Sequence, residues 1–276
     1  MPELNGDEAE VRDEEVTLDL GEPSPEVMDY ARRELGESDE VKCQTIQELR
    51  DMIYVNYYNF KEEHPEIHQD VNPLEMKHIG EDDVMTVPSY RTNCGRRMMI
   101  YRLGNWDPRK YPVEEIFKAT VIILELGVLE PRAQILGGVA IFDLQGITMS
   151  HAWTITPQVA NMVIALMVTA FPMKTTAIHI LHQSWVFDVM FAVFKPLLDV
   201  RMQNKIFFHG SNMDSLHQHI APSHLPKKYG GTREELPYYM WMDNLSKDLR
   251  IVKEMMQAGY VIHPDLMKQM GLPIEK

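Results

Sequence analysis

The sequence predicts an α/β protein built on a mainly parallel sheet whose strands are joined by crossover helices. From residue 97 onward, short apolar runs of strand length alternate with longer helical patterns. This alternation is typical of parallel sheets, because a parallel pair needs a connection of helix length to bring the chain back. The 276 residues suffice for one large domain with a helical appendage, or for two modest domains.

Helical patterns come first along the chain. Ser24 can cap a helix that runs through Glu34, with Pro25 at its first position, where proline is well tolerated. A second helical pattern begins near Glu40 and ends before Pro65.

The alternating part of the chain follows. Strands are expected over residues 97–103, 138–144, 176–181 and 205–208. Helices are expected over residues 113–130, 157–171, 185–198 and 213–220. From Tyr238 onward the pattern predicts a C-terminal helical tail.

The acidity of the chain is concentrated near its start. The formal net charge is −14, and residues 1–40 hold 15 acidic and 3 basic side chains, whereas the rest holds 26 acidic and 24 basic ones. We therefore expect an acidic, disordered leader over residues 1–22 and a body close to neutrality. Such a balance does not favour nucleic-acid binding.

Cysteine usage and the first residues indicate a reducing, cytoplasmic setting. Two cysteines, Cys43 and Cys94, are too few for a disulfide framework. The opening MPELNGDEAEVRDEE is acidic and polar, unlike a signal or transit peptide. We expect a monomer in the cytoplasm.

Common catalytic and cofactor motifs are missing from the sequence. It contains no GxSxG elbow, no GxxxxGK[ST] or GxGxxG loop, and no HExxH or CxxC pair. His179 and His182 lie three apart on an expected strand, so their side chains point to opposite faces and fit ordinary structural roles better than joint metal ligation. We therefore expect no catalytic residue, no metal site and no cofactor.

Two expected helices are unusually apolar. The first, PQVANMVIALMVTAF (157–171), has three polar residues, and the second, WVFDVMFAVFKPLL (185–198), has two charged ones. A helix that is apolar on all sides needs cover on both faces. Either both helices are sandwiched in the core, or one face of each lines a cavity or meets a membrane. The second helix is too short to span a bilayer.

Motifs between Met99 and Gly231 resemble those of a known family. They are IYRLGNWDP (100–108), AIFDLQG (140–146), SHAWTITPQVA (150–160), FPMKTTAIHILHQ (171–183), FKPLL (194–198), HG (209–210) and LPKKYGG (225–231). In this order and spacing they resemble the CRAL-TRIO lipid-transfer family, in the branch of α-tocopherol transfer protein, retinaldehyde-binding protein and clavesin. The resemblance implies a lipid-binding domain over residues 81–236, an N-terminal helical domain over 23–80 and a helical tail over 237–276.

The resemblance also implies a lipid pocket between the sheet and the helices, closed by a movable helix over residues 186–198. The implied pocket residues are Phe117, Thr120, Val121, Leu124, Phe142, Ile155, Val163, Leu166, Met167, Met173 and Ile178. The implied rim and lid residues that meet the bilayer are Met149, Trp153, Val186, Met190 and Val193. An exposed Trp and Met cluster on a mobile helix would suit insertion into a membrane interface.

Three basic residues match positions that bind phosphoinositide headgroups in this branch: Lys174, Arg201 and Lys205. Arg201 and Lys205 are four apart on an expected helix, which would place them on one face. The alternative is an ordinary solvated face with two bases. Thr176 replaces a further basic residue of the family pattern, so this site is expected to be weaker or differently tuned.

The chain departs from the family pattern in two regions. Gly138 stands where a bulky pocket residue is usual, and His182 replaces an asparagine at the hinge before the lid. The larger departure is N-terminal, because an LLRFLRAR-type helix is absent, as though Tyr54 were joined directly to Val55. We therefore expect a truncated helical domain.

Three classes of function follow, in decreasing order of preference. The first is a carrier that binds a hydrophobic lipid, such as tocopherol or a retinoid, and transfers it at membranes with the help of phosphoinositides. The second is a clavesin-like, phosphoinositide-binding regulator of endosomal or vesicle trafficking. The third is an enzyme. Either of the first two would visit endosomal or other internal membranes transiently.

Overall fold

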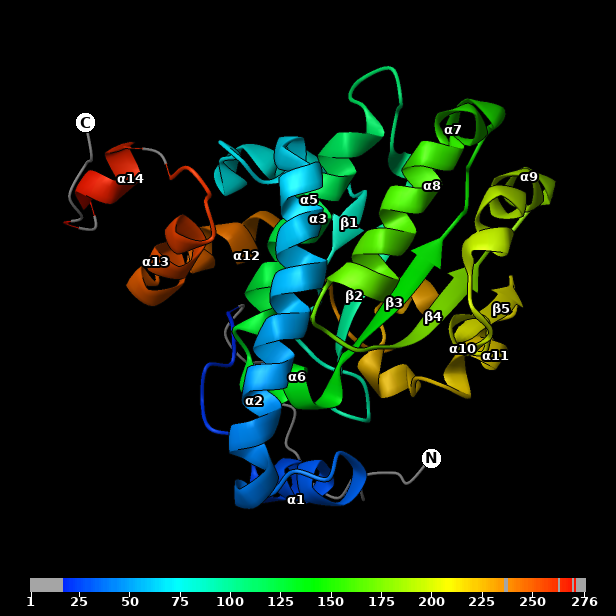
Figure 1. Cartoon of the computed structure of the whole chain (residues 1–276). Helices are drawn as coiled ribbons and strands as arrows, with labels where there is room; N and C mark the ends of the chain where they lie inside the picture. The colour runs from blue at the N-terminus through cyan, green and yellow to red at the C-terminus, as the bar shows by residue number, and fades with distance from the viewer. Residues whose placement is uncertain (1–16, 236–237, 263, 270, 272–276) are drawn as a thin grey trace.

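The computed structural model describes residues 17–235, 238–262, 264–269 and 271. A sheet in the order β1-β2-β3-β4-β5 forms its centre (Figure 1). The strands are β1 (Met85–Thr86), β2 (Arg97–Arg102), β3 (Gly138–Asp143), β4 (Thr175–Leu181) and β5 (Ile206–Gly210). Strands β2 to β5 pair in parallel, while β1 is antiparallel to β2. The predicted fold class is confirmed; β1 escaped prediction because two residues are too short to produce a pattern.

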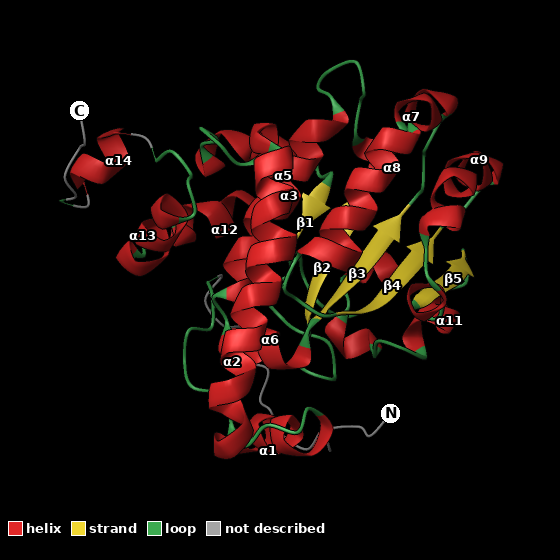
Figure 2. Cartoon of the chain, in the orientation of Figure 1, coloured by secondary structure: helices red, strands yellow, loops and turns green. Residues whose placement is uncertain are grey.

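Crossover helices join the parallel strands (Figure 2). They are α5 (Val113–Val128), α6 (Pro131–Leu136), α7 (Met149–Thr154), α8 (Pro157–Ile164), α9 (Trp185–Phe194) and α10 (Val200–Gln203). Helix α11 (Met213–His217) follows the last strand. The helix expected over residues 157–171 continues from α8 as a π-helical segment, η5 (Ala165–Ala170). The helix expected over 185–198 ends as a 3-10 turn, η6 (Lys195–Leu197).

The alternation of side chains gives the sheet two different apolar faces. On one face Ile100, Ile141 and Leu181 pack beneath the segment from α11 to Tyr229. On the other face Ala140 and Ile178 point toward α9 and its neighbours. A period of two along each strand produces this division, and the second face holds the site described below.

The N-terminal helical layer contains one continuous helical run. Helix α1 (Pro25–Glu34) begins after its Ser24 cap as predicted. The continuous run consists of α2 (Asp39–Ile53), the π-helical segment η1 (Tyr54–Tyr58) and α3 (Asn59–Glu63). Helix α4 (Lys77–Glu81) follows separately. The predicted junction between Tyr54 and Val55 falls inside the π-helical segment η1.

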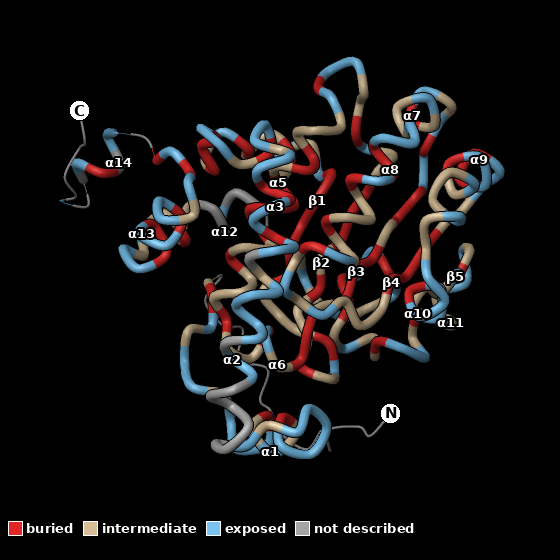
Figure 3. Tube along the Cα trace, in the orientation of Figure 1, coloured by how far each residue is buried: buried red, intermediate tan, exposed pale blue. Residues whose placement is uncertain are grey.

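The described side chains of this helical run include buried and exposed apolar residues (Figure 3). Near the C-terminus of the run, Tyr57 and Phe60 are buried against α5 and η5, and Lys61 pairs with Glu125 at 2.9 Å. Five large apolar side chains are exposed to solvent: Ile46, Leu49, Met52, Val55 and Tyr58. The truncation of the helical domain stays a prediction.

Both ends of the described chain pack onto the body. The tail forms α12 (Tyr238–Leu245), α13 (Leu249–Gln257) and α14 (Pro264–Gln269), and Ile251, Val252 and Met255 are buried in the core cluster that also holds residues of α5. Residues 1–16 of the expected leader lie outside the described part of the chain, whereas residues 17–21 lie against the body, with Leu18 buried.

Candidate functional site

An apolar cavity of about 190 Å³ lies between the sheet and the helices α5, α8 and α9. An apolar cavity of ~150 Å³ can stay dry and hold benzene, so this space already suits a larger apolar guest. The strands contribute Tyr101, Phe142, Ile178, Ile180 and Ile206 to its walls. The helices contribute Val113, Ile116, Phe117, Thr120, Ile155, Val159, Val163, Ile164, Leu166, Met167, Val168, Phe187, Met190, Phe191 and Phe194.

The few polar groups of the cavity wall are bonded to the protein itself. The Trp106 indole donates to a backbone carbonyl at 2.9 Å, and His151 is bonded through both ring nitrogens. Tyr101 and Thr120 bond each other at 3.0 Å, and burial raises the pKa of the Tyr101 phenol. The cavity therefore offers apolar contact and little ionic chemistry, which is the surface that a hydrophobic ligand needs.

The lid helix α9 presents different apolar residues to its two sides. Val186, Phe187 and Met190 are buried and face the cavity side of the sheet. Trp185 and Val189 face outward and are 66% and 48% exposed. A large apolar surface turned to solvent marks a surface that binds protein or membrane.

A residue with a positive φ precedes α9, the implied lid helix. His182 has a φ of 53°, which is uncommon outside glycine. Its backbone N–H donates to Gly210 O at 2.7 Å, and its Nδ1 lies 2.7 Å from Oδ1 of the fully buried Asp143. Tyr229 also donates to Asp143, at 3.1 Å. The start of the lid is thus fixed to the carboxyl end of β3, while the helix itself is held by apolar contacts.

The structure places most of the implied pocket residues around this cavity. Eight of them line it: Phe117, Thr120, Phe142, Ile155, Val163, Leu166, Met167 and Ile178. Leu124 and Met173 line a second, smaller cavity. Val121 is buried between α5 and its helical neighbours and lines neither one. These positions remain predictions as ligand contacts.

The implied rim and lid residues are not all on the surface. Trp153 on α7 is 77% exposed, whereas Met149 and Val193 are half-buried. Val186 and Met190 face inward in this closed arrangement. The outward residues of the lid, Trp185 and Val189, were missed, although their spacing of four on an expected helix already separates them from the inward set.

Arg201 and Lys205 do not share a helix face, so that prediction is wrong, whereas headgroup binding by Lys174, Arg201 and Lys205 stays a prediction. Helix α10 ends at Gln203, and Lys205 stands just before β5, where its Nζ donates to Thr175 O at 2.9 Å. Arg201 is exposed and pairs with Asp199 at 3.1 Å, while Lys174 is also exposed. The predicted helix was too long, because α10 occupies only the few residues between its cap Asp199 and the start of β5 at Ile206.

Three histidines gather on the other face of β4 and β5. His179 Nδ1 lies 2.9 Å from His209 Nε2, and the His219 ring lies tilted against His179 and edge-on to His209. Burial and the two neighbouring imidazoles lower the pKa of His179 to about 3. Within the described residues, no group of three or more His, Cys, Asp or Glu side chains is arranged to hold a metal ion. Among the same residues, no helix is long and apolar enough to cross a membrane.

The sheet, the apolar cavity and the covering helix define an α/β protein with an internal hydrophobic site. Residues 81–231 match the CRAL/TRIO domain, and because this match spans more than half of the chain, the protein belongs to the CRAL/TRIO family, which is known for lipid binding and transfer.

Curated relatives agree with this family. The human alpha-tocopherol transfer protein-like protein is 29% identical over 76% of this chain and 71% of its own length. Human clavesin-2 is 26% identical over 75% of this chain and 74% of its own length. The crystal structure of Sfh5 aligns with 81% of this chain and 84% of that chain, with a TM-score of 0.45 and 13% identity.

Proposed function

We propose that this protein binds one hydrophobic lipid in the cavity beneath α9 and transfers it between membranes. The observation that carries the proposal is the apolar cavity itself, whose polar wall groups are already bonded within the protein. Tocopherol and retinoids are candidate cargoes. Gly138 enlarges the space beside the first residues of the sheet, which favours a cargo whose shape differs from that of tocopherol.

The energetics of such a cavity suit a shuttle. A lipid that buries ~400 Å² of apolar surface would gain about 10 kcal/mol relative to water, as an upper figure. Relative to a bilayer the gain is small, because pocket and bilayer are both apolar. The cargo can therefore load from a membrane and unload to another without a chemical step, and the protein needs no catalytic residue for it.

We propose that the lid helix is the part that meets the membrane. Trp185 and Val189 on α9 and Trp153 on α7 supply exposed apolar side chains on neighbouring elements. Their insertion into an interface would stabilise an outward position of α9. Lys174 and Arg201 are exposed cations that can attract phosphoinositide headgroups, whereas Lys205 first has to release Thr175 O. Transient residence on endosomal membranes belongs to this proposal.

The test compares neighbouring residues on the two sides of α9. Met190→Trp fills the cavity, whereas Val189→Trp adds the same ring on the outside. Lipid extracted from the purified proteins is identified and quantified by mass spectrometry. We expect a stoichiometric hydrophobic lipid in the wild-type protein and in Val189→Trp, and at least a tenfold loss in Met190→Trp. Equal amounts in both variants would contradict the cavity as the binding site.

The same preparation separates the carrier from a trafficking regulator. Vesicles of phosphatidylcholine with or without phosphatidylinositol bisphosphate are sedimented with the protein. Binding to the phosphoinositide vesicles with no extracted lipid in the wild-type protein would favour the clavesin-like role over the carrier.

A further inference from the structure

A short N-terminal strap, defined as residues 17–21, crosses the edge of the body at which β2, β3 and β4 begin. Leu18 in this strap is only 7% exposed and belongs to the main core cluster. Leu20 packs against the same cluster but is only partly buried. The hinge of the lid lies at the opposite, carboxyl edge of the strands.

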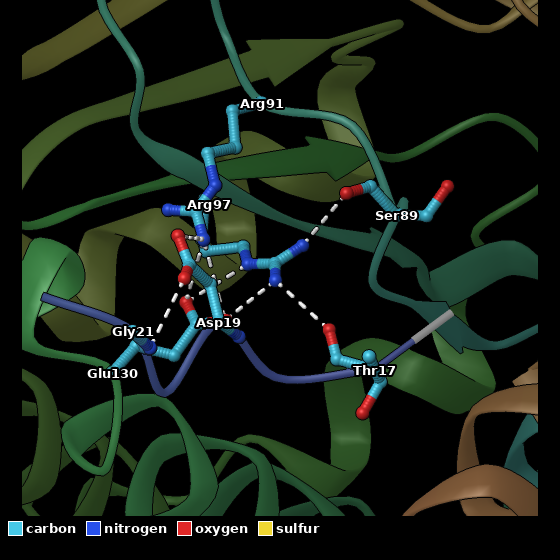
Figure 4. A network of polar contacts seen from close by, with 7 residues as sticks. All are labelled: Thr17, Asp19, Gly21, Ser89, Arg91, Arg97 and Glu130. Carbon is cyan, nitrogen blue, oxygen red and sulfur yellow. Dashed lines mark hydrogen bonds and ion pairs between the residues drawn. The ribbon is translucent and has the colours of Figure 1, made fainter. Parts of the chain in front are cut away.

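Charged groups hold the strap in place (Figure 4). The Asp19 backbone N–H donates to Glu130 Oε1 at 2.7 Å, and Arg97 donates to Thr17 O at 3.2 Å. Arg91 pairs with Asp19 at 3.3 Å, and Arg97 Nε donates to Glu130 Oε2 at 3.0 Å. Glu130 is fully buried, so these bonds fix both the strap backbone and the polar groups beneath it.

Leu18 lines a second cavity of about 70 Å³. This cavity shares three wall residues, Tyr101, Thr120 and Met167, with the main cavity. Tyr101 and Thr120 are bonded to each other, whereas Met167 has a flexible, unbranched side chain and sits in the π-helical segment η5. Of the three, Met167 is therefore the residue that can rotate most easily.

Two glycines make room in the second cavity. A Cβ on Gly127 would lie 3.7 Å from the sulfur and the terminal methyl of Met173, and a Cβ on Gly138 would lie 3.9 Å from the same methyl. Both distances are ordinary van der Waals contacts, so a side chain at either position would occupy the cavity without distorting the backbone.

From this arrangement we infer that rotation of Met167 joins the two cavities into one cargo pocket. Leu18 is then the end wall of this pocket and limits the length of the apolar lipid chain that the protein accepts. Because Gly127 and Gly138 have no side chains, the second cavity has room for the end of the lipid's apolar chain. The inference rests on the proposed function. It places the apolar tail of an elongated cargo at the strap end, because Arg97 and Glu130 at this end are bonded to each other and to the strap and so are already paired within the protein.

The experiment measures the chain length of bound alcohols. Delipidated wild-type protein and variants are mixed with an equimolar series of saturated primary alcohols from decanol to eicosanol, and native mass spectrometry gives the distribution of lengths bound. Leu18→Ala removes three carbons from the end wall, so the most abundant alcohol should become about two carbons longer. Each further buried methylene is worth about a fourfold preference.

Two more variants make the result specific. Leu20→Ala changes the same strap without touching the cavity and should keep the wild-type distribution. Gly127→Ala adds one methyl against Met173 in a helix that tolerates alanine well and should shift the distribution to shorter alcohols. Melting temperatures monitor folding, and Gly127→Ala decides the question if Leu18→Ala does not fold.

The outcomes separate the two proposals. Unchanged length distributions in both Leu18→Ala and Gly127→Ala would overturn the role of the strap while leaving the carrier intact. A wild-type protein that binds no alcohol of any length would overturn the proposed function itself.

Discussion

The two ends of the pocket are closed by different physical means. The lid end is held by apolar contacts such as those of Phe187 and Met190, and it turns Trp185 toward solvent. The strap end is held by buried charges, because Glu130 accepts hydrogen bonds from Arg97 and from the strap backbone. A membrane can replace apolar contacts with its own, whereas buried charges cannot separate without loss. We therefore expect the lid end, and not the strap end, to open at a membrane.

The largest expected effect lies at the strap end. Burial alone would raise the pKa of Glu130, but the hydrogen bond from Arg97 and the charges of Arg97 and Arg91 lower it below its ordinary value. Glu130→Ala would leave two mostly buried guanidinium groups without their carboxylate. We expect the free energy of unfolding, measured in urea, to fall by about 3–5 kcal/mol. An unchanged free energy would show that the strap end is not held by charge.

A second test uses pH to weaken the sheet beside the lid. His179 lies on β4 and contacts His209 of the neighbouring strand β5, and Phe208 of β5 packs against Phe187 of the lid. The folded-state pKa of His179 is about 3, below the unfolded value of ~6.5. The folded protein thus binds fewer protons than the unfolded chain between these values, and its stability falls as the pH falls below ~6.5.

The expected size of this pH effect follows from the same values. At pH 5 the loss from His179 alone is about 2 kcal/mol. Glu130 affects stability only at lower pH. Its pKa is lowered, so the carboxylate keeps its charge and its ion pairs until the solution is strongly acidic. Urea unfolding at neutral pH and at pH 5 measures the loss, and His179→Gln should abolish most of the difference. A variant that keeps the full pH dependence would assign it to other groups.

The sequence predicted the sheet and its cavity better than the two closures. Alternating apolar residues such as Ile178 and Ile180 show from the sequence alone which face of a strand is buried. The apolar helices expected over 157–171 and 185–198 indicated either a sandwiched core or a cavity. The strap could not be predicted in this way. Leu18 stands in an acidic stretch, and its burial depends on Arg91, Arg97 and Glu130, which lie far along the chain. The expected strand over residues 205–208 already conflicted with a helix through Lys205, and the end of α10 at Gln203 decides between the two.

A third test concerns the outward face of the lid. Trp185→Ala removes a 66% exposed ring from α9 and should weaken binding to phosphatidylcholine vesicles about tenfold, since burying a large apolar side chain contributes ~1.5–3 kcal/mol when complete. Leu35→Ala removes an exposed apolar residue at the C-terminal cap of α1 and serves as the control. Vesicle sedimentation measures both. An equal loss of vesicle binding in the two variants would mean that any exposed apolar side chain contributes to membrane binding, wherever it lies on the protein.

The smallest expected effect belongs to the cations near the lid. Arg201 is 90% exposed and pairs only through solvent-accessible contacts with Asp199, so Arg201→Ala costs the fold little. Near an anionic membrane one such charge contributes ~1 kcal/mol, which corresponds to about fivefold weaker binding to phosphatidylinositol bisphosphate vesicles. Lys205→Ala should have a smaller effect, because Lys205 is already bonded to Thr175 O. The reverse order would mean that Lys205 leaves this carbonyl at the membrane, and the lid end would then open together with the start of β5.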